Sequence, residues 1–288
     1  MGGFLLHALG VMMAVYTGAP LDLAALFWGQ VVITATQLMT HYANDYFDLD
    51  ADRKNQTPTN WSGGSRVLVE ARLPARAALY SALVLAGIAF AANLVLSMIV
   101  RPGLTTFLLL LAAQALAWFY SAPPIRLHSR GIGEATTMLV VTVFTPLTGY
   151  YLQAGRLDWL PLLAAAPLCC FQFAMLLAIE FPDEAGDRQA GKRTLVVRRG
   201  ARAAARYYAA LVLLAYGLLP VLVVLGLPLL VAAAVGALAP LGLWQVWRIV
   251  RGDWQIPARW NRLAFYTIVL LMTSAAAELA AFTLLTGL

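Results

Sequence analysis

The sequence predicts an all-α, polytopic membrane protein, and three observations support that prediction. Of its 288 residues, 61% are hydrophobic and only 12% are charged, with a mean hydropathy of +0.75. An average soluble domain has about 25% charged residues. Apolar runs long enough to cross a bilayer, which takes about 20 residues, recur along the whole chain. Lysine and arginine gather in alternate loops between those runs, as is typical of membrane proteins.

The apolar runs predict about nine transmembrane helices. We interpret the first, short run as a helix rather than a signal peptide, because no basic segment precedes it and no small-residue cleavage site follows it. The loops are too short for a separate soluble domain, so a single domain over residues 1–288 is expected. In chain order, the predicted helices cover residues 4–18, 23–44, 76–100, 103–120, 132–153, 158–181, 203–225, 228–249 and 263–287.

The distribution of basic residues predicts the orientation of the chain. Eighteen of the 20 lysines and arginines lie in the loops after the second, fourth, sixth and eighth helices, and only Arg101 and Arg156 lie in the others. The positive-inside rule then places the N-terminus and the basic loops in the cytoplasm and the C-terminus outside, in the plasma or inner membrane of a cell. The net charge of +6 follows from this distribution. No basic and aromatic nucleic-acid motif is present, so no nucleic-acid partner is expected.

Two acidic clusters at the ends of apolar runs share one spacing. They hold eight of the 14 acids, and each core reads i, i+3, i+7. On one continuous helix this spacing places three carboxylates on one face, with Asn44 one turn before Asp48. Carboxylates beside hydrocarbon are costly, so they are expected to pair, line a wet cavity or bind a cation. The two cores are Asp45, Asp48 and Asp52, and Glu180, Asp183 and Asp187.

Two opposed rows of carboxylates indicate a site for a hard cation. Mg²⁺ in particular prefers a few carboxylates together with phosphate oxygens of a substrate. The expected metal ligands are Asp45, Asp48, Asp52, Asp183 and Asp187, and the substrate should carry a diphosphate. Basic residues just beyond each cluster would meet the remaining phosphate charge, although membrane topology accounts for some of them as well. These residues are Lys54, Arg66, Lys192 and Arg193.

The second acidic cluster repeats the first at an offset of 135 residues, from Asp45 to Glu180. Four predicted helices separate the two copies, which suggests a four-helix unit used twice, with the second and sixth helices facing each other.

Cysteine and histidine, which also commonly bind metals, do not indicate a further metal site. Cys169 and Cys170 are adjacent in an apolar run, and the three histidines are scattered, so neither a disulfide framework nor a zinc site is expected.

Three motifs carry a resemblance to a known family. NDYFDLDAD fits the pattern NxxxDxxxD, PDEAGD fits DxxxD, and YSAPPIRLHSRGIGE (residues 120–134) follows the fourth helix. In this order, and across nearly the whole chain, they resemble the UbiA superfamily of intramembrane prenyltransferases. The resemblance implies helices arranged around a central cavity open to lipid. It also implies that the acidic motifs hold Mg²⁺ and a polyprenyl diphosphate at the cytoplasmic side.

The resemblance further implies electrophilic alkylation. Ionisation of the allylic C–O bond of the polyprenyl diphosphate leaves an allyl cation, which an electron-rich aromatic acceptor attacks. Asp48, Asp183 and Tyr120 are the implied catalytic residues, with the π-face of Tyr120 beside the cation. Asn44 and Arg126 join the basic residues as substrate-binding groups. Arg126 stands in the loop where some relatives place a lysine.

The acceptor and the class of function each have alternatives. The segments GGSRVLVEARLP, YSAPPIRLHSRGIGE and DRQAGKRTL most resemble the 1,4-dihydroxy-2-naphthoate branch, which serves menaquinone synthesis. The same chemistry on 4-hydroxybenzoate, homogentisate, a chlorophyllide or haem precursor, or a glycerol phosphate lipid stays open. A cation-coupled transporter would also use intramembrane acids, although acids at helix ends beside basic loops favour a diphosphate site. Glu134 and Glu278 are left outside the predicted site.

Overall fold

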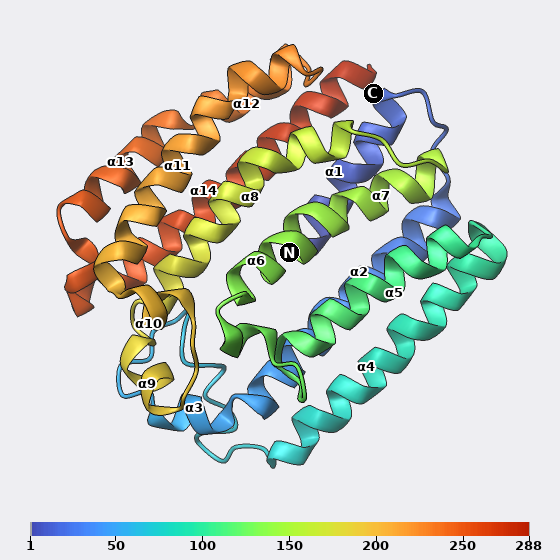
Figure 1. Ribbon diagram of the computed structural model, residues 1–288. Coiled ribbons are helices and arrows are strands. Elements are labelled where there is room, and N and C mark those ends of the chain that lie inside the picture. The colour runs from blue at the N-terminus through green and yellow to red at the C-terminus, as the bar shows by residue number, and fades with distance from the viewer. Residues whose placement is uncertain (1, 288) are drawn as a thin grey trace.

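The computed structural model describes residues 2–287, and within that range the secondary structure is entirely helical. Long helices run side by side, and three short helices, α3, α9 and α10, gather at one end of the bundle (Figure 1). The long elements are α1 (Gly2–Tyr16), α2 (Leu23–Phe47), α4 (Ala75–Val95), α5 (Leu104–Ser121), α7 (Thr145–Ala154), α8 (Leu160–Glu180), α11 (Ala201–Val224), α12 (Leu229–Gly236), α13 (Ala239–Val250) and α14 (Pro257–Thr286). The all-α prediction is confirmed.

The predicted count of nine spans is not confirmed. Within residues 2–287, seven helices are long and apolar enough to cross a membrane, and α12 with α13 adds an eighth span if this pair, bent by 43°, is counted as one. The remaining apolar helix, α1, has 15 residues. At 1.5 Å per residue it is about 22 Å long, which is shorter than the roughly 30 Å hydrocarbon core of a bilayer.

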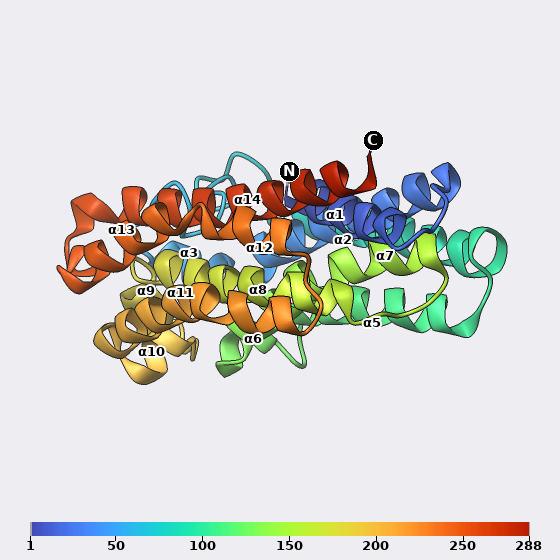
Figure 2. The same cartoon turned by 90° about the horizontal axis from the view of Figure 1, so that it is seen from above.

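Small residues let α1 pack closely on α7. A Cβ placed on Gly10 would lie 2.0 Å from the carbonyl oxygen of Pro146, and one on Gly149 would lie 2.4 Å from that of His7. Backbones this close leave no room for a side chain, which is how glycine is used between helices in membranes. Figure 2 shows α1 and α14 running next to each other, and the two helices are in contact. The start of α1 is thereby fixed against the centre of the bundle.

An irregular helix follows the loop after α5. It begins as α6 (Gly133–Met138), widens into a π-helical segment, η3 (Leu139–Phe144), and continues as α7. Pro146 has no backbone N–H to donate, and such a residue is a common cause of a local break in helix geometry. The Thr145 hydroxyl donates to the Val140 carbonyl oxygen at 3.1 Å and satisfies part of the disturbed ladder. This segment borders the cavity described below.

Each acidic motif spans a junction between a long helix and a helix of six residues. The helix α2 ends at Phe47 and α3 covers Leu49–Lys54, whereas α8 ends at Glu180 and α9 covers Glu184–Gln189. Asp48 lies at the first junction with ψ near 1°, outside helical geometry. The prediction of three carboxylates on one continuous helix is therefore wrong, because the chain turns inside each motif. The short helices α3 and α9 lie in contact with each other.

Candidate functional site

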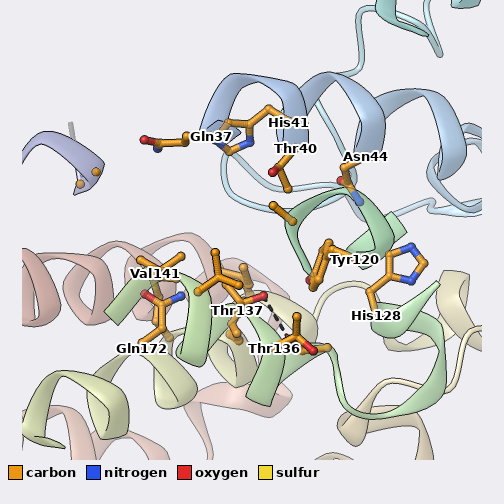
Figure 3. Close-up of a pocket in the computed structure, with 18 of the residues that line it drawn as sticks. Gln37, Thr40, His41, Asn44, Tyr120, His128, Thr136, Thr137, Val141 and Gln172 are labelled. Atoms are coloured by element: carbon orange, nitrogen blue, oxygen red, sulfur yellow. Dashed lines mark hydrogen bonds between the residues drawn. The ribbon is translucent and has the colours of Figure 1, made fainter. Parts of the chain in front are cut away.

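A cavity of about 860 Å³ lies between the helices, and its wall changes character along its length. Acidic and basic side chains surround the end near α3 and α9. The other end is formed mainly by apolar groups, including Val32, Leu110, Phe144 and Leu271. Isolated polar side chains of α2, α6 and α8, among them Gln37, His41, Thr137 and Gln172, also face it (Figure 3). The cavity can therefore hold a molecule with a charged head and an apolar tail.

Asp48 is the most closely surrounded carboxylate of the site. Its side chain is 4% exposed and accepts hydrogen bonds from donors on three different segments. The His128 Nε2 lies 2.7 Å from Oδ1, and the Asn44 amide nitrogen donates to Oδ2 at 2.7 Å. Lys192 Nζ donates to Oδ2 at 2.8 Å. The Asn44 amide is itself held, since it also donates to the Ser121 hydroxyl at 2.9 Å.

Lys192 joins the two acidic motifs. Its Nζ lies 2.8 Å from Asp48 and 3.5 Å from Asp187, and the side chain is only 13% exposed. Gly191, at φ +76°, lets the chain turn back after α9, and the Lys192 N–H donates to the Asp187 carbonyl oxygen at 2.9 Å. Lys192 thus stands between a carboxylate of the first motif and one of the second.

The loop after α3 closes the other side of the acidic end. The Ser65 hydroxyl donates to Asp45 Oδ2 at 2.6 Å, and the Asn55 amide donates to Asp183 Oδ1 at 2.6 Å. Gly64 has φ +68°, which favours glycine, and a Cβ placed there would lie 2.2 Å from an oxygen of Asp52, so a larger residue would displace this carboxylate. Asp52 and Asp183 line the cavity without an ion pair among the residues 2–287.

The structure brings most of the predicted site residues to the cavity wall. These are Asn44, Asp45, Asp48, Asp52, Tyr120, Asp183, Asp187 and Lys192. The other four predicted residues do not line it. Arg66 donates to the Asp52 carbonyl oxygen, and the exposed Lys54, at 3.4 Å, donates to the Gln189 carbonyl oxygen. Arg126 is exposed, and Arg193 points into a separate surface hollow shared with Arg198 and Arg199.

His128 is the residue that the sequence reasoning missed. It was one of three scattered histidines, yet it lies 6% exposed against Asp48, with the Tyr120 ring edge-on at 5.4 Å. Its presence in the segment 120–134 was the available signal, because that segment follows the helix that carries Tyr120. Ser121 and Asn55, which hold Asn44 and Asp183, were missed as well. Ser121 belongs to the same segment 120–134, whereas Asn55 has no local signal.

The pKa values of the carboxyl groups separate into two kinds. Burial alone would raise the pKa of Asp48, but the hydrogen bond from His128 and the charge of Lys192 outweigh it and hold the pKa at about 2. Burial raises the pKa of Asp52 to about 7, with the charge of Asp48 adding to the rise and that of Lys192 opposing it. Burial and the charge of Asp187 raise the pKa of Asp183 to about 7. Asp52 and Asp183 therefore have too little positive charge nearby to offset the cost of ionising them in a buried position.

These carboxylates fit Mg²⁺ that is shared with a phosphate ligand. Within residues 2–287, no three acidic, histidine or cysteine side chains lie close enough together to hold a metal by themselves. Mg²⁺ is commonly held by one or two carboxylates plus phosphate oxygens, without a complete protein cage. Oxygen donors on two facing segments, two of them short of positive charge, match that requirement.

Mg²⁺ binding should consequently depend on pH. Asp52 and Asp183, with pKa values near 7, are largely protonated below that pH, and protons then compete with the metal. Between about pH 8 and about pH 6, affinity should fall by about tenfold for each of the two carboxyls that must ionise. Calorimetry with Mg²⁺ and an unreactive prenyl diphosphate analogue measures this. An affinity that stays constant over this range would contradict the assignment of these two residues.

Comparison with known proteins places the chain in a family. A model of the UbiA prenyltransferase family matches residues 4–269. A protein of Mycobacterium leprae named 1,4-dihydroxy-2-naphthoate octaprenyltransferase is 30% identical over 205 residues, which is 69% of this chain and 66% of that protein. A protein of the same name from Mycobacterium tuberculosis is 28% identical over 232 residues, 79% of this chain and 76% of that one. The chain thus matches just under two thirds of the length of the first relative.

Solved structures share the fold. A UbiA homolog from Aeropyrum pernix K1 superposes with a TM-score of 0.73 at 18% identity, covering 96% of each chain. A UbiA homolog from Archaeoglobus fulgidus bound to DMAPP and Mg²⁺ gives a TM-score of 0.62 at 15% identity, covering 98% of this chain and 96% of that one. The family model covers most of the sequence, and the structural matches extend over nearly all of it. The chain belongs to the UbiA prenyltransferase family.

Proposed function

We propose that this protein transfers a polyprenyl group from a polyprenyl diphosphate to an aromatic acceptor in an Mg²⁺-dependent reaction. The observation that carries the proposal is the acidic end of the cavity, where Asp48 and Asp187 face each other across Lys192 and Asp52 and Asp183 lie nearby. The oxygens of a diphosphate would complete the coordination of Mg²⁺, and Mg²⁺ would supply the positive charge that this end lacks. The apolar remainder of the cavity suits the first part of a prenyl chain.

The residues of the acidic end have separate roles in this proposal. Asp45, Asp48, Asp52, Asp183 and Asp187 would hold Mg²⁺, which when bound neutralises the departing diphosphate. Lys192 binds phosphate oxygens and holds the diphosphate with its allylic carbon toward the apolar part. Both N–H groups of Asn44 are taken by Asp48 and Ser121, so Asn44 would act on the diphosphate through Asp48. When the C–O bond breaks, the diphosphate leaves with the electron pair. The ring of Tyr120, on the cavity wall, offers its π-face to the allyl cation.

The proposed acceptor is 1,4-dihydroxy-2-naphthoate. The two relatives named for this acceptor support it, as do the three motifs that extend beyond the aspartates. A ring carbon of the acceptor bonds to the allyl cation and the carboxylate leaves as carbon dioxide. The electron pair of the broken C–C bond stays with the ring and either restores it directly or takes up the proton that the alkylated carbon loses, so no net proton is released. Arg126 is exposed and donates to the Phe47 carbonyl oxygen at 3.4 Å, so its side chain is poorly placed to bind the acceptor. Polar groups on the cavity wall, such as His41 and Gln172, are better placed.

The positions of the basic residues support an orientation of the protein in the membrane. The acidic end, with α3, α9 and α10, carries most of the basic loops, whereas Arg101 lies at the other end, where it donates to the carbonyl oxygens of Leu152 and Gln153. By the positive-inside rule we place the acidic end in the cytoplasm and the C-terminus outside. The start of α1, where Gly3 lies beside Gln37 of α2, is near the centre of the bundle and not at the acidic end. Single cysteines introduced in the exposed turns at each end can be labelled in sealed cells with a reagent that does not cross the membrane. Reaction of the acidic end from outside would reverse this assignment.

A direct assay tests the reaction and the acceptor together. Purified protein in detergent is incubated with Mg²⁺, a labelled polyprenyl diphosphate and one acceptor at a time from a panel of 1,4-dihydroxy-2-naphthoate, 4-hydroxybenzoate and homogentisate. We expect a prenylated naphthoquinol by mass spectrometry, and complete loss of product when Mg²⁺ is chelated. Product that persists after chelation would contradict the metal dependence. Movement of intact prenyl diphosphate across vesicles, without product, would favour a transporter instead.

A further inference from the structure

His128 lies at the acidic end with both ring nitrogens occupied inside the protein. Nε2 is 2.7 Å from Asp48 Oδ1, and Nδ1 is 2.6 Å from the Ser129 hydroxyl. Since an ionised carboxylate only accepts hydrogen bonds, Nε2 must carry the proton. In the neutral ring Nδ1 then accepts from the Ser129 hydroxyl. A histidine whose two nitrogens are both taken by the protein has none left for a substrate.

The segment that carries His128 is anchored to the loop that carries Lys192. The Ser129 carbonyl oxygen accepts from the Arg193 N–H at 3.1 Å, and the Glu134 carboxylate accepts from the Leu195 N–H. Gly133 packs against the histidine, because a Cβ there would lie 2.6 Å from the His128 Cα. The short helix η2 (Leu127–Arg130) is therefore fixed in place, and so is the imidazole that projects from it toward Asp48.

The donors around Asp48 divide its two oxygens. Among the residues 2–287, His128 is the one side chain with a hydrogen bond to Oδ1, whereas Asn44 and Lys192 both donate to Oδ2. The terminal torsion of an aspartate is broad and only two-fold, so a carboxylate held at one oxygen can still rotate. Fixing Oδ1 directs Oδ2 toward the gap between the two motifs, where Lys192 now stands.

We propose that His128, supported by Ser129, is a positioning residue that sets the orientation of the Asp48 carboxylate for binding of Mg²⁺ and diphosphate. This inference rests on the proposed function, and His128 acts on the ligand only through Asp48. Carboxylates that bind metals are commonly oriented by such hydrogen bonds, and loss of the supporting group costs about 10- to 100-fold in metal affinity or activity. The requirement is a donor at the position of Nε2, and not an imidazole as such.

Three substitutions at residue 128 test this requirement. The amide nitrogen of glutamine follows the same number of bonds as Nε2 of histidine, whereas that of asparagine corresponds to Nδ1. His128→Gln should keep the hydrogen bond to Asp48, and His128→Asn and His128→Ala should lose it. Ser129→Ala removes only the support of the ring, so its effect should be smaller than that of His128→Ala. Arg130→Ala is the matched control, because Arg130 is exposed in the same helix and does not line the cavity.

The readout is Mg²⁺-dependent binding of an unreactive thio-analogue of geranyl diphosphate, together with the Mg²⁺ concentration that gives half-maximal turnover. His128→Ala and His128→Asn should raise that concentration and the dissociation constant by about tenfold or more. His128→Gln should restore both to within about threefold of the native protein. Glutamine and asparagine are similar in polarity, so their comparison holds even if the alanine variant does not fold.

The outcomes separate the inference from the proposed function. If native protein binds the analogue in an Mg²⁺-dependent manner but His128→Gln is as impaired as His128→Asn, the positioning role is wrong. Equal, native-like binding in all three variants overturns it as well. If the native protein itself binds no analogue in the presence of Mg²⁺, the proposed function fails first. A fall in melting temperature alone, with unchanged Mg²⁺ dependence, would make His128 a structural residue and contradict the inference.

Discussion

Asp183→Asn and Asp48→Asn should each lower turnover by well over tenfold, which corresponds to more than about 1.4 kcal/mol in the barrier. Each substitution removes one negative charge from the acidic end while keeping the shape of the side chain. At Asp48 it also replaces an oxygen that accepts from His128, Asn44 or Lys192 by an NH₂ group that faces other donors. Steady-state kinetics with the preferred acceptor, at saturating Mg²⁺, measures the effect. Full activity in either variant would mean that the site is misplaced.

Asp50→Asn is the matched control for this experiment. Asp50 lies in the same motif, only two residues from Asp48, but its side chain is 88% exposed and pairs loosely with Arg53 at 3.8 Å. It does not line the cavity. Its substitution should leave turnover within a few fold of the native value, because exposed ion pairs contribute little. An equal loss at Asp50 and Asp48 would indicate a general effect of charge in this region.

Lys192→Met should have opposite effects on two ligands. Without the ammonium group, turnover of prenyl diphosphate should fall by more than about tenfold, because the interaction of a nearly buried positive charge with the phosphate is lost. Binding of Mg²⁺ alone should become tighter, because Lys192 now contacts both Asp48 and Asp187 and competes with a cation for them. Kinetics and calorimetry without substrate measure the two effects separately. Weaker binding of both ligands would contradict this view of Lys192.

Neighbouring basic residues provide the comparison for Lys192. The Arg193 side chain lies in a different hollow, so Arg193→Ala should cost much less than a substitution at Lys192. Arg202→Ala combined with Arg206→Ala should leave turnover within a few fold, because both residues belong to α11 and many other charges maintain the orientation. Equal, small effects at all four positions would mean that these charges serve topology alone.

The sequence predicted the class of fold and the acidic end because both depend on local patterns. Hydropathy located most helices to within a few residues and showed that the first apolar run is short, although α14 begins six residues before the predicted start. It cannot show that the chain bends between α12 and α13. The motif spacing identified the carboxylates that line the cavity. It did not predict the break in helix geometry at Asp48, because the contacts that favour it come from residues far along the chain.

Proximity in sequence was a poor guide to the basic residues. Lys54 and Arg66 flank the first motif, but their side chains bind backbone carbonyl oxygens, and Arg66 has φ +63°, which turns the chain there. Arg126 likewise has φ +50° and points outward. Lys192 and Arg193 are adjacent, yet only one of them faces the cavity. Side-chain direction in a loop follows from backbone angles that no motif specifies.

The pairing of α3 with α9 makes the acidic end depend on contacts between distant parts of the chain. These helices have the same length, start 135 positions apart (Leu49 and Glu184), and are joined by Lys54 to Gln189 and by Asn55 to Asp183. Contacts between such distant residues close a long loop of chain, and the entropy of that closure opposes them. A ligand that bridges both halves therefore favours the completed bundle over any partly assembled form, by mass action. Bound substrate would then stabilise the association of α3 with α9 on which its own site depends.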